Sequence, residues 1–321
     1  MAKKMEKNHS IKLIIQIPCY NEEETLPVVL GELPRELPGI DSIEWLVIDD
    51  GSEDNTAEVA RKHGVDHIIV HPQNKGLATA FTTGLKASLE RGADIIVNTD
   101  ADNQYKSSCI PDLLQPILDN KAEFVIGARP IDKIENFSSI KKILQRLGSW
   151  TVRMASGTDI PDAPSGFRAI SRSAALKLNI FSGYTYTLET IIQAGKKGIA
   201  ITWVPIETNK ELRPSRLLSS IPSYIFHSMV TIVRIFIVYR PFRFFASIGV
   251  ILSLFGTALL LRFLYFYFTG GGAGHIQSVV IGGVLVAIGF HTILIAFMAD
   301  LISVNRRLLE QIKASLHKDP F

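Results

Sequence analysis

The chain has 321 residues, 47% of them hydrophobic, and a formal net charge of +3 at pH 7. It is too long for one ordinary domain and long enough for a large core. The small net charge carries no nucleic-acid signature, so we expect no nucleic-acid partner. The two cysteines, Cys19 and Cys109, imply no disulfide framework and fit a reducing compartment.

Strands and helices alternate along the first two-thirds of the chain. Apolar runs predict strands over residues 13–18, 45–48, 67–70, 95–98 and 124–127, with helices over 23–33, beyond 52 and over 76–89. This alternation indicates βαβ units and a largely parallel sheet. The predicted fold class is therefore α/β.

Polar residues able to bind ligands follow most of these strands. They are Tyr20 to Glu22, Asp49 to Ser52, Lys75-Gly76, Asp100 with Asp102, and Arg129. Each alone is equally an ordinary turn, a helix entry or a surface side chain. Together they favour a binding site, because open α/β sheets bind ligands at the carboxyl ends of their strands.

Asp100 and Asp102 form the central pair. In extended backbone, residues i and i+2 point the same way, so both carboxylates face one object. A hard cation such as Mg²⁺ takes one or two carboxylates and fills its other positions with water and substrate phosphates. The pair therefore predicts a metal and phosphate site.

Two other nucleotide motifs are missing. No Gly-x-Gly-x-x-Gly follows the first strand, and no Gly-x-x-x-x-Gly-Lys-Ser/Thr occurs anywhere. Dinucleotide binding of the Rossmann type and a P-loop are thereby excluded.

The remaining motifs carry a family resemblance. Pro18-x-Tyr20-Asn21-Glu22, Asp49-Asp50-Gly51-Ser52, Asp100-Ala101-Asp102-x-Gln104, Gly127-x-Arg129 and Ser165-Gly166-Phe167-Arg168 occur in this order. The chain resembles family 2 glycosyltransferases of GT-A fold, and within them the dolichol- or polyprenyl-phosphate sugar synthases. The resemblance covers residues 13–216.

The resemblance implies a role for each matching position. The implied nucleotide-binding residues are Pro18, Tyr20, Asn21, Glu22, Ile48, Asp50, Lys75 and Ala101, with Asp50 on the base. Asp100, Asp102 and Gln104 would hold Mg²⁺ or Mn²⁺.

Basic side chains would receive the phosphates. Arg129 would meet the diphosphate or the acceptor phosphate, and Lys210, Arg213 and Arg216 would add basic character, although the identities there depart from the family pattern. Some relatives have an acid where this chain has Gly166, which leaves Asp162 as the nearest acidic candidate for a catalytic group.

The last third predicts two membrane spans. Residues 244–261 carry no charge and give about 27 Å of helix, enough to cross hydrocarbon; this span extends to Phe268. A second uncharged stretch covers Ile276 to Ala299. Arginines and lysines flank the pair and are absent from the 269–275 loop, which places both flanks in the cytoplasm. Residues 223–239 are interpreted as a helix lying in the membrane interface.

We therefore expect a catalytic domain over 1–216, an interfacial helix region over 217–241, two transmembrane helices over 242–301 and a cytoplasmic tail over 302–321. The resemblance implies inverting transfer of a sugar from a nucleotide sugar, UDP-linked or alternatively GDP-linked, to a polyprenyl phosphate such as undecaprenyl or dolichyl phosphate. It also implies a homo-oligomer and a multi-pass protein of the cell membrane, or of the endoplasmic reticulum in a eukaryote. The alternatives are a polysaccharide synthase and a non-catalytic membrane scaffold.

Overall fold

The computed structural model describes residues 10–130, 139–178, 186–209, 230, 233–234, 237–270 and 272–316. The chain divides into two compact units, Met1–Phe226 and His227–Phe321. The predicted acceptor-binding side chains Lys210, Arg213 and Arg216 lie outside the described residues. Most of the predicted interfacial helix over 223–239 does so too.

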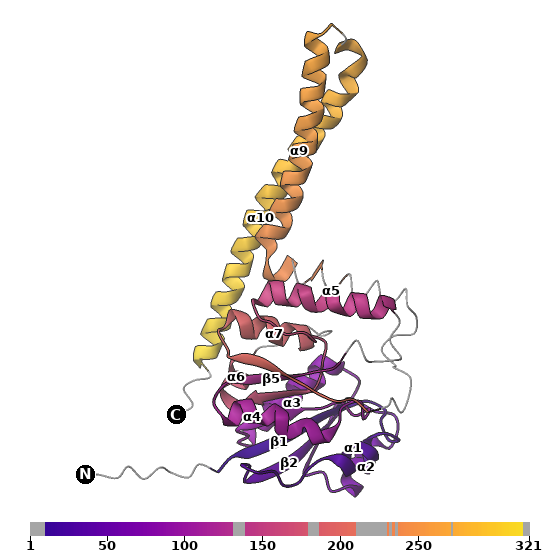
Figure 1. The fold of residues 1–321 in the computed structure, drawn as a ribbon, viewed down its shortest axis with the longest axis vertical. Helices are drawn as coiled ribbons and strands as arrows, with labels where there is room; N and C mark the ends of the chain where they lie inside the picture. The colour runs from indigo at the N-terminus through magenta and orange to yellow at the C-terminus, as the bar shows by residue number, and fades with distance from the viewer. Residues whose placement is uncertain are drawn as a thin grey trace, which may run out of the picture. The chain divides into compact units, whose positions relative to one another are not determined.

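A seven-stranded sheet forms the centre of the first unit (Figure 1). Its order is β3-β2-β1-β4-β6-β5-β7. The strands are β1 Lys12–Cys19, β2 Ser42–Asp49, β3 His67–Val70, β4 Ile95–Asn98, β5 Phe124–Ala128, β6 Arg168–Ser171 and β7 Ile201–Pro205. All neighbouring pairs are parallel except the two made by β6. The predicted, largely parallel sheet is confirmed.

Helices cover both faces of this sheet. Helices α1 (Leu26–Glu32), α2 (Thr56–Lys62) and α4 (Ile110–Leu118) contribute to one apolar core with alternate residues of β1. Helix α3 (Leu77–Glu90) packs on the other face, where Gly84 lies against Gln16. The first unit also contains α5 (Ser139–Ser156), α6 (Arg172–Lys177) and α7 (Tyr186–Lys196).

Helix α1 begins later than predicted. The sequence pattern placed its start at Glu23, but the first helical residue is Leu26, followed by a proline in the first turn. The preceding segment is fixed as a turn instead, because the Thr25 hydroxyl donates to the Glu22 carboxylate over 2.6 Å. A local side-chain hydrogen bond of this kind competes with the helix.

Strand register brings distant segments to one edge of the sheet. Cys19 pairs with Asp49 across the parallel strands β1 and β2, and Gln16 pairs with Asn98 across β1 and β4. Because β6 is antiparallel, its first residue Arg168 lies opposite Asn98, the last residue of β4. The segment before β6 therefore meets the segment after β4, which carries Asp100.

The second unit is a pair of apolar helices, α9 (Pro241–Phe268) and α10 (Ile276–Leu316), joined through a short 3₁₀ turn at Gly272–His275. Pro241–Phe268 and Ile276–Asn305 have mean hydropathies of 2.3 and 2.4, and only 11% and 17% of their most apolar windows is buried. By length and composition both helices are able to cross a membrane. Their exposure argues against helices buried in a soluble core.

Glycines let α9 and α10 approach closely. A Cβ on Gly249 would lie 2.7 Å from the carbonyl oxygen of Gly289, and one on Gly256 would lie 2.7 Å from that of Gly282. Small residues at such crossings allow backbone-to-backbone packing, the usual basis of helix association in lipid.

Candidate active site

The ends of β1 and β2 form one border of the site. Pro18 and Ile48, both predicted to hold the nucleoside, pair across the two strands. Tyr20 follows with 39% of its surface exposed, whereas Glu22 is buried. An aromatic side chain open to solvent at a strand end is a suitable platform for a planar base.

Asp50 is held from three directions. Its carboxylate accepts from the His71 ring over 2.6 Å, from the Lys75 backbone N–H over 3.0 Å and from the Gly76 N–H over 2.7 Å. The other ring nitrogen of His71 contacts the Thr83 hydroxyl at 3.0 Å. Asp50 thus fixes the loop between β3 and α3, and this loop leaves the Lys75 side chain exposed.

A second network ties the β1 end to the β2 end. The backbone N–H of Asn21 donates to the Ser52 hydroxyl over 2.9 Å, and the Asn21 side chain accepts from the Glu53 N–H over 2.8 Å. Asn21 has a φ of 55°, a left-handed conformation that asparagine adopts more readily than most residues. The polar residues that follow the two strands therefore form one rigid border.

Asp100 lies beyond the end of β4 against Gly166. A Cβ at position 166 would lie 2.8 and 2.9 Å from the two carboxylate oxygens of Asp100, closer than real Cβ contacts permit. The Tyr105 hydroxyl accepts from the Gly166 N–H over 2.9 Å, and the same side chain acts to lower the pKa of Asp100. Asn98, the last residue of β4, donates to the Gly166 carbonyl over 2.8 Å. These contacts seat the Asp100 carboxylate.

The carboxylate pair has the chemistry of a cation site. Burial raises the pKa of Asp100 to about 7, and the charge of Asp102 adds to this rise, although Arg129 and Arg168 oppose it. A divalent cation relieves both effects, since it supplies positive charge where two anions crowd. No cluster of three or more histidine, cysteine or acidic side chains suited to a metal occurs within the described ranges. A pair that relies on substrate phosphates for its other ligands fits Mg²⁺ or Mn²⁺.

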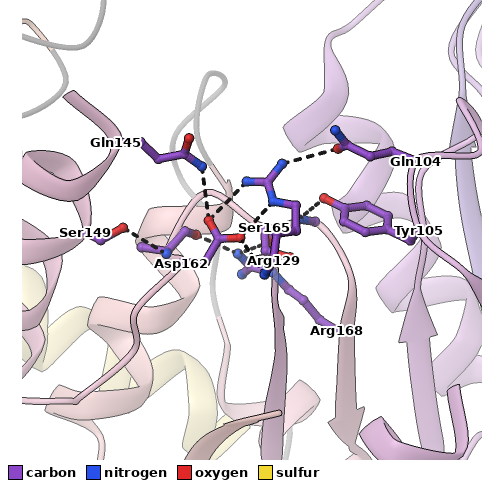
Figure 2. Close-up of polar contacts among 10 residues, drawn as sticks. Gln104, Tyr105, Arg129, Gln145, Ser149, Asp162, Ser165 and Arg168 are labelled. Atoms are coloured by element: carbon purple, nitrogen blue, oxygen red, sulfur yellow. Dashed lines mark hydrogen bonds and ion pairs between the residues drawn. The ribbon is translucent and has the colours of Figure 1, made fainter. Parts of the chain in front are cut away.

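Arg129, beyond the end of β5, is clamped by Asp162 (Figure 2). Its Nε and Nη2 groups donate to the two Asp162 oxygens over 2.7 and 3.0 Å, and its backbone N–H donates over 3.1 Å. Its Nη1 group donates to the Gln104 Oε1 over 3.2 Å. The ion pair is almost fully buried, with side-chain exposures of 8% and 1%. The guanidinium is thus held in one orientation.

Helix α5 supports the clamp from the far side. Gln145 donates to the Asp162 carboxylate over 3.2 Å, and the Ser149 hydroxyl accepts from the Ala163 N–H over 3.2 Å (Figure 2). The Asp162 carboxylate therefore accepts from both Arg129 and Gln145. This makes it a well-anchored counter-ion.

A second arginine, Arg168, is fully buried beneath the site. Its guanidinium donates to the carbonyls of Ala163, Ser165 and Thr187 and to the Thr190 hydroxyl. None of these partners is a carboxylate. Burial lowers its pKa, and the charge of Asp100 is among the influences that raise it. Arg168 therefore adds positive potential under the Asp100 carboxylate.

The residues predicted for the site fall into three groups. Pro18, Tyr20, Asn21, Glu22, Ile48, Asp50 and Lys75 lie at the β1–β2–β3 border, Ala101 and Asp102 follow Asp100, and Arg129 lies with Gln104 and Asp162. The Gln104 oxygen, predicted as a metal ligand, accepts a hydrogen bond from Arg129. The roles of these side chains stay predictions.

The sequence did not predict the residues that hold the site residues in place: Asn98 and Tyr105, which hydrogen-bond Gly166, and Gln145, which hydrogen-bonds Asp162. The one available signal was Gly166, where an expected acid is replaced by a residue with no side chain.

Comparison with known proteins identifies the family. Residues 14–178, about half of the chain, match the family Glycosyl transferase family 2. The chain belongs to glycosyl transferase family 2.

Two relatives of this glycosyltransferase chain carry descriptive names. It is 30% identical over 222 residues to an undecaprenyl-phosphate mannosyltransferase from Micrococcus luteus, covering 66% of this chain and 89% of that protein. It is 33% identical over 213 residues to a UDP-N-acetylglucosamine–dolichyl-phosphate N-acetylglucosaminyltransferase from Methanococcus voltae, covering 60% of this chain and 83% of the relative.

The fold has a counterpart among solved structures. Glucosyl-3-phosphoglycerate synthase from Mycobacterium tuberculosis, solved with Mn²⁺, UDP and its product, superposes with a TM-score of 0.55 at 22% identity. The match covers 69% of this chain and 80% of that one. The GT-A-like α/β fold class predicted from the sequence is confirmed, together with the two apolar C-terminal helices. The chain is a glycosyltransferase.

Proposed function

We propose that this glycosyltransferase moves a sugar from a nucleotide sugar to the phosphate of a membrane polyprenyl phosphate, with inversion at the anomeric carbon. The observation that carries the proposal is the Asp100–Asp102 pair beside a clamped arginine, in a chain that also has two helices apolar enough to cross a bilayer. The first feature suits a sugar diphosphate, and the second suits an acceptor that does not leave the membrane.

The named relatives support the acceptor class. Both act, by name, on a polyprenyl phosphate, one undecaprenyl and the other dolichyl. One of the two names UDP as its donor nucleotide, and the structural relative was solved with UDP. We therefore favour a UDP-sugar donor, with a GDP-sugar as the alternative.

Asp100 and Asp102 would hold Mg²⁺ or Mn²⁺, and related structures contain Mn²⁺ or Mg²⁺ together with UDP. When bound, such an ion neutralises the negative charge that develops on the departing diphosphate. Gly166 contributes by leaving the Asp100 carboxylate room, and Tyr105 contributes by holding the Gly166 backbone in place.

The remaining roles belong to side chains. Tyr20 and Asp50 lie at the border proposed for the nucleoside, and the Arg129 guanidinium would meet the diphosphate or the acceptor phosphate. Asp162 is proposed as the residue that positions Arg129 rather than as a base, because its carboxylate is already engaged. A strong base is not required, since the second pKa of a phosphate monoester is about 6 and the attacking oxygen is anionic at neutral pH.

Helices α9 and α10 are proposed as membrane spans with the catalytic unit on the cytoplasmic side. Arg240 and Arg243 precede the first span and Arg306 and Arg307 follow the second, in agreement with the positive-inside rule. Self-association stays a prediction.

The decisive experiment uses the full chain in lipid nanodiscs, a short-chain polyprenyl phosphate and a panel of UDP- and GDP-sugars, with and without chelator. We expect glycolipid from one donor and its loss on chelation, with recovery on adding Mg²⁺ or Mn²⁺.

Asp102→Ala should abolish this turnover, whereas Asp112→Ala, which removes an exposed acid on α4, should leave it intact. Full metal-dependent turnover by Asp102→Ala would contradict the metal assignment. The absence of transfer from every donor, with a folded protein, would favour the scaffold alternative.

A further inference from the structure

Three fully buried polar side chains lie side by side in the centre of the sheet. The register of β1, β4 and β6 places Gln16 beside Asn98 and Asn98 beside Arg168, and the exposed fraction of each is 0%. Side chains at one level of neighbouring strands point to the same face of a sheet. Here it is the face covered by α3, because a Cβ on Gly84 of that helix would lie 2.7 Å from the Gln16 Oε1. We call Gln16, Asn98 and Arg168 the polar row.

The polar row is unusual for the middle of a sheet. Its neighbours at the same level, Leu46 on β2 and Ile126 on β5, are apolar and fully buried. Strands buried on both faces are normally continuous apolar runs. Gln16 interrupts such a run in β1, and its Oε1 atom has no hydrogen-bond partner within the part of the chain that the structure describes. A buried acceptor without a partner lowers stability, so stability alone does not account for a glutamine here.

The hydrogen bonds of Gln16 run in one fixed direction. Its Nε2 group donates to the Asn98 Oδ1 over 2.9 Å and to the carbonyl oxygen of Phe81 on α3 over 3.4 Å. Both partners are oxygens, so a rotated Gln16 amide would place its own oxygen against them. The Asn98 Nδ2 group therefore points the other way, toward the Gly166 carbonyl at 2.8 Å and the Tyr186 hydroxyl at 3.3 Å.

Gly166 is thus held by both of its backbone polar groups. Asn98 donates to its carbonyl oxygen, and the Tyr105 hydroxyl accepts from its N–H over 2.9 Å. The Asp100 carboxylate lies directly against this glycine, with its two oxygens 2.8 and 2.9 Å from the position of a Cβ there. Because the space is so close-fitting, a shift of the Gly166 backbone changes the place available to the Asp100 carboxylate.

We propose that Gln16 is a positioning residue of the active site. It fixes the Asn98 amide, Asn98 fixes Gly166, and Gly166 fixes the place of the Asp100 carboxylate. The inference rests on the proposed function, in which Asp100 holds the divalent cation. Side chains that support a metal's ligands typically change its affinity by about 10- to 100-fold. Gln16 acts through a further residue, so we expect a smaller effect, on the order of three- to tenfold.

Gln16→Met tests this role. Methionine is also long and unbranched but removes both the donor and the unpaired oxygen. The full chain is placed in lipid nanodiscs, and Mn²⁺ binding in the presence of UDP or GDP is measured from the electron paramagnetic resonance signal of the free ion. We expect Mn²⁺ to bind about three- to tenfold more weakly. The thermal unfolding midpoint should fall by a few degrees at most, since one unpaired buried acceptor is exchanged for another, the Asn98 Oδ1.

Transfer kinetics add a second measurement. The Mn²⁺ concentration that gives the half-maximal rate should rise by the same factor in Gln16→Met, whereas kcat at saturating Mn²⁺ should be retained. A residue that served stability alone would change the unfolding midpoint and leave this metal requirement unaltered.

Gln193→Met is the matched control. Gln193 lies on α7 outside the polar row, is only 3% exposed and donates to the Glu189 carboxylate over 3.3 Å. The same substitution there should lower the unfolding midpoint and leave Mn²⁺ binding unchanged. If Gln16→Met also binds Mn²⁺ as the unaltered chain does, Gln16 serves the packing of the sheet alone and the proposal is overturned.

The double variant Gln16→Met/Asn98→Leu tests the route. Replacing both partners of a buried hydrogen bond by apolar groups is far less harmful than replacing one, so this variant stays informative if Gln16→Met folds poorly. Since Gln16 is proposed to act through Asn98, the double variant should bind Mn²⁺ no more weakly than Asn98→Leu alone. A further loss of affinity in the double variant would contradict the route.

Binding and transfer are measured on the same nanodiscs, so the two proposals fail separately. Transfer by the unaltered chain together with normal Mn²⁺ binding by Gln16→Met refutes the positioning role alone. Weaker binding by Gln16→Met without transfer from any donor supports the positioning role and refutes the proposed reaction. If the unaltered chain binds no Mn²⁺ with either nucleotide, the metal assignment and the positioning role are both refuted.

Discussion

Gly166 decides what the Asp100 carboxylate is able to do. In the sequence, Gly166 stands where some relatives have an acid. In the structure, the Asp100 carboxylate lies so close to Gly166 that a Cβ at this position would collide with it. The antiparallel pairing of β6 with β4 produces this contact, since Arg168 lies opposite Asn98. A residue without a side chain is therefore part of the proposed metal site.

Gly166→Ala is expected to lower metal-dependent transfer on the order of a hundredfold, because the new methyl group displaces the Asp100 carboxylate by a fraction of an ångström or more. Transfer rates across a Mg²⁺ or Mn²⁺ titration, together with thermal unfolding, check this. The control is Gly31→Ala on α1, where an added Cβ meets nothing within 4 Å; it should leave transfer unchanged. Equal losses of stability in both variants with normal transfer in Gly166→Ala would contradict the assignment.

Asp162→Asn tests the arginine clamp. The substitution leaves the buried Arg129 guanidinium without its counter-ion, which costs about 3–5 kcal/mol of unfolding free energy for a buried pair. We also expect a ten- to hundredfold fall in kcat/KM, since the guanidinium is no longer held in one orientation. Thermal melts and steady-state kinetics separate the two effects, and rescue by Asp162→Glu would indicate that charge matters more than reach. Asp112→Asn is the matched surface control, and an unaltered kcat/KM in Asp162→Asn would refute the positioning role.

At this scale the sequence predicted single residues better than their partners. Asp100 and Asp102 were recognisable because two carboxylates follow an apolar strand at a spacing of two. The Arg129–Asp162 pair was not, since 33 residues separate its members and only the fold brings them together. Spacing rules reach across one helix turn or one strand, and long-range ion pairs lie beyond them.

At the scale of elements, α5 joins the surface to the site. The helix was absent from the sequence prediction although Ile143, Leu147, Trp150 and Met154 recur at helical spacing; what the sequence does not show is that these residues are exposed and that the polar face is the buried one. Strand β6 was also missed: it has four residues and begins with the buried Arg168, so it lacks the apolar run that marked β1, β2 and β4. A short strand that begins with a buried charged residue is the kind of element that pattern reading fails to find.

Gln145→Leu tests the link from α5 to the clamp. The leucine keeps the volume but removes the donor to Asp162, so we expect a loss of about 1 kcal/mol in unfolding free energy. We also expect a KM for the donor or acceptor raised several-fold, because Asp162 would hold Arg129 less firmly. Steady-state kinetics on both substrates is the measurement. The control is Gln115→Leu on α4, which removes a surface hydrogen bond to Asp119 and should change neither KM. If Gln145→Leu also leaves both KM values unchanged, Gln145 does not help to position Arg129 through Asp162.

At the scale of the whole molecule, the two apolar C-terminal helices could be predicted from the sequence. Long uncharged stretches need no tertiary information to be recognised. Helix α9 (Pro241–Phe268) begins a few residues before the predicted start of the first span at residue 244 and ends at the predicted Phe268. The second helix runs on to Leu316, well past Ala299, because the residues beyond the apolar stretch are themselves good helix formers. What the hydropathy pattern does not contain is the pairing of the two helices, which depends on single glycines.

Replacing those glycines tests whether the hairpin is one packed unit. In Gly256→Leu the side chain would be forced against the carbonyl oxygen of Gly282, 2.7 Å from the position of its Cβ. Overpacking of this kind costs about 1–3 kcal/mol or more, so we expect α9 and α10 to separate. Cysteine pairs across the crossing should then lose disulfide formation, and the protein should become less monodisperse after detergent extraction.

Gly283→Leu on α10 introduces the same side chain where a Cβ meets nothing within 4 Å and should behave as the unaltered chain. If both variants extract and crosslink alike, the helices are not held by close glycine contact, and the hairpin owes its pairing to the surrounding side chains and the short turn at Gly272–His275.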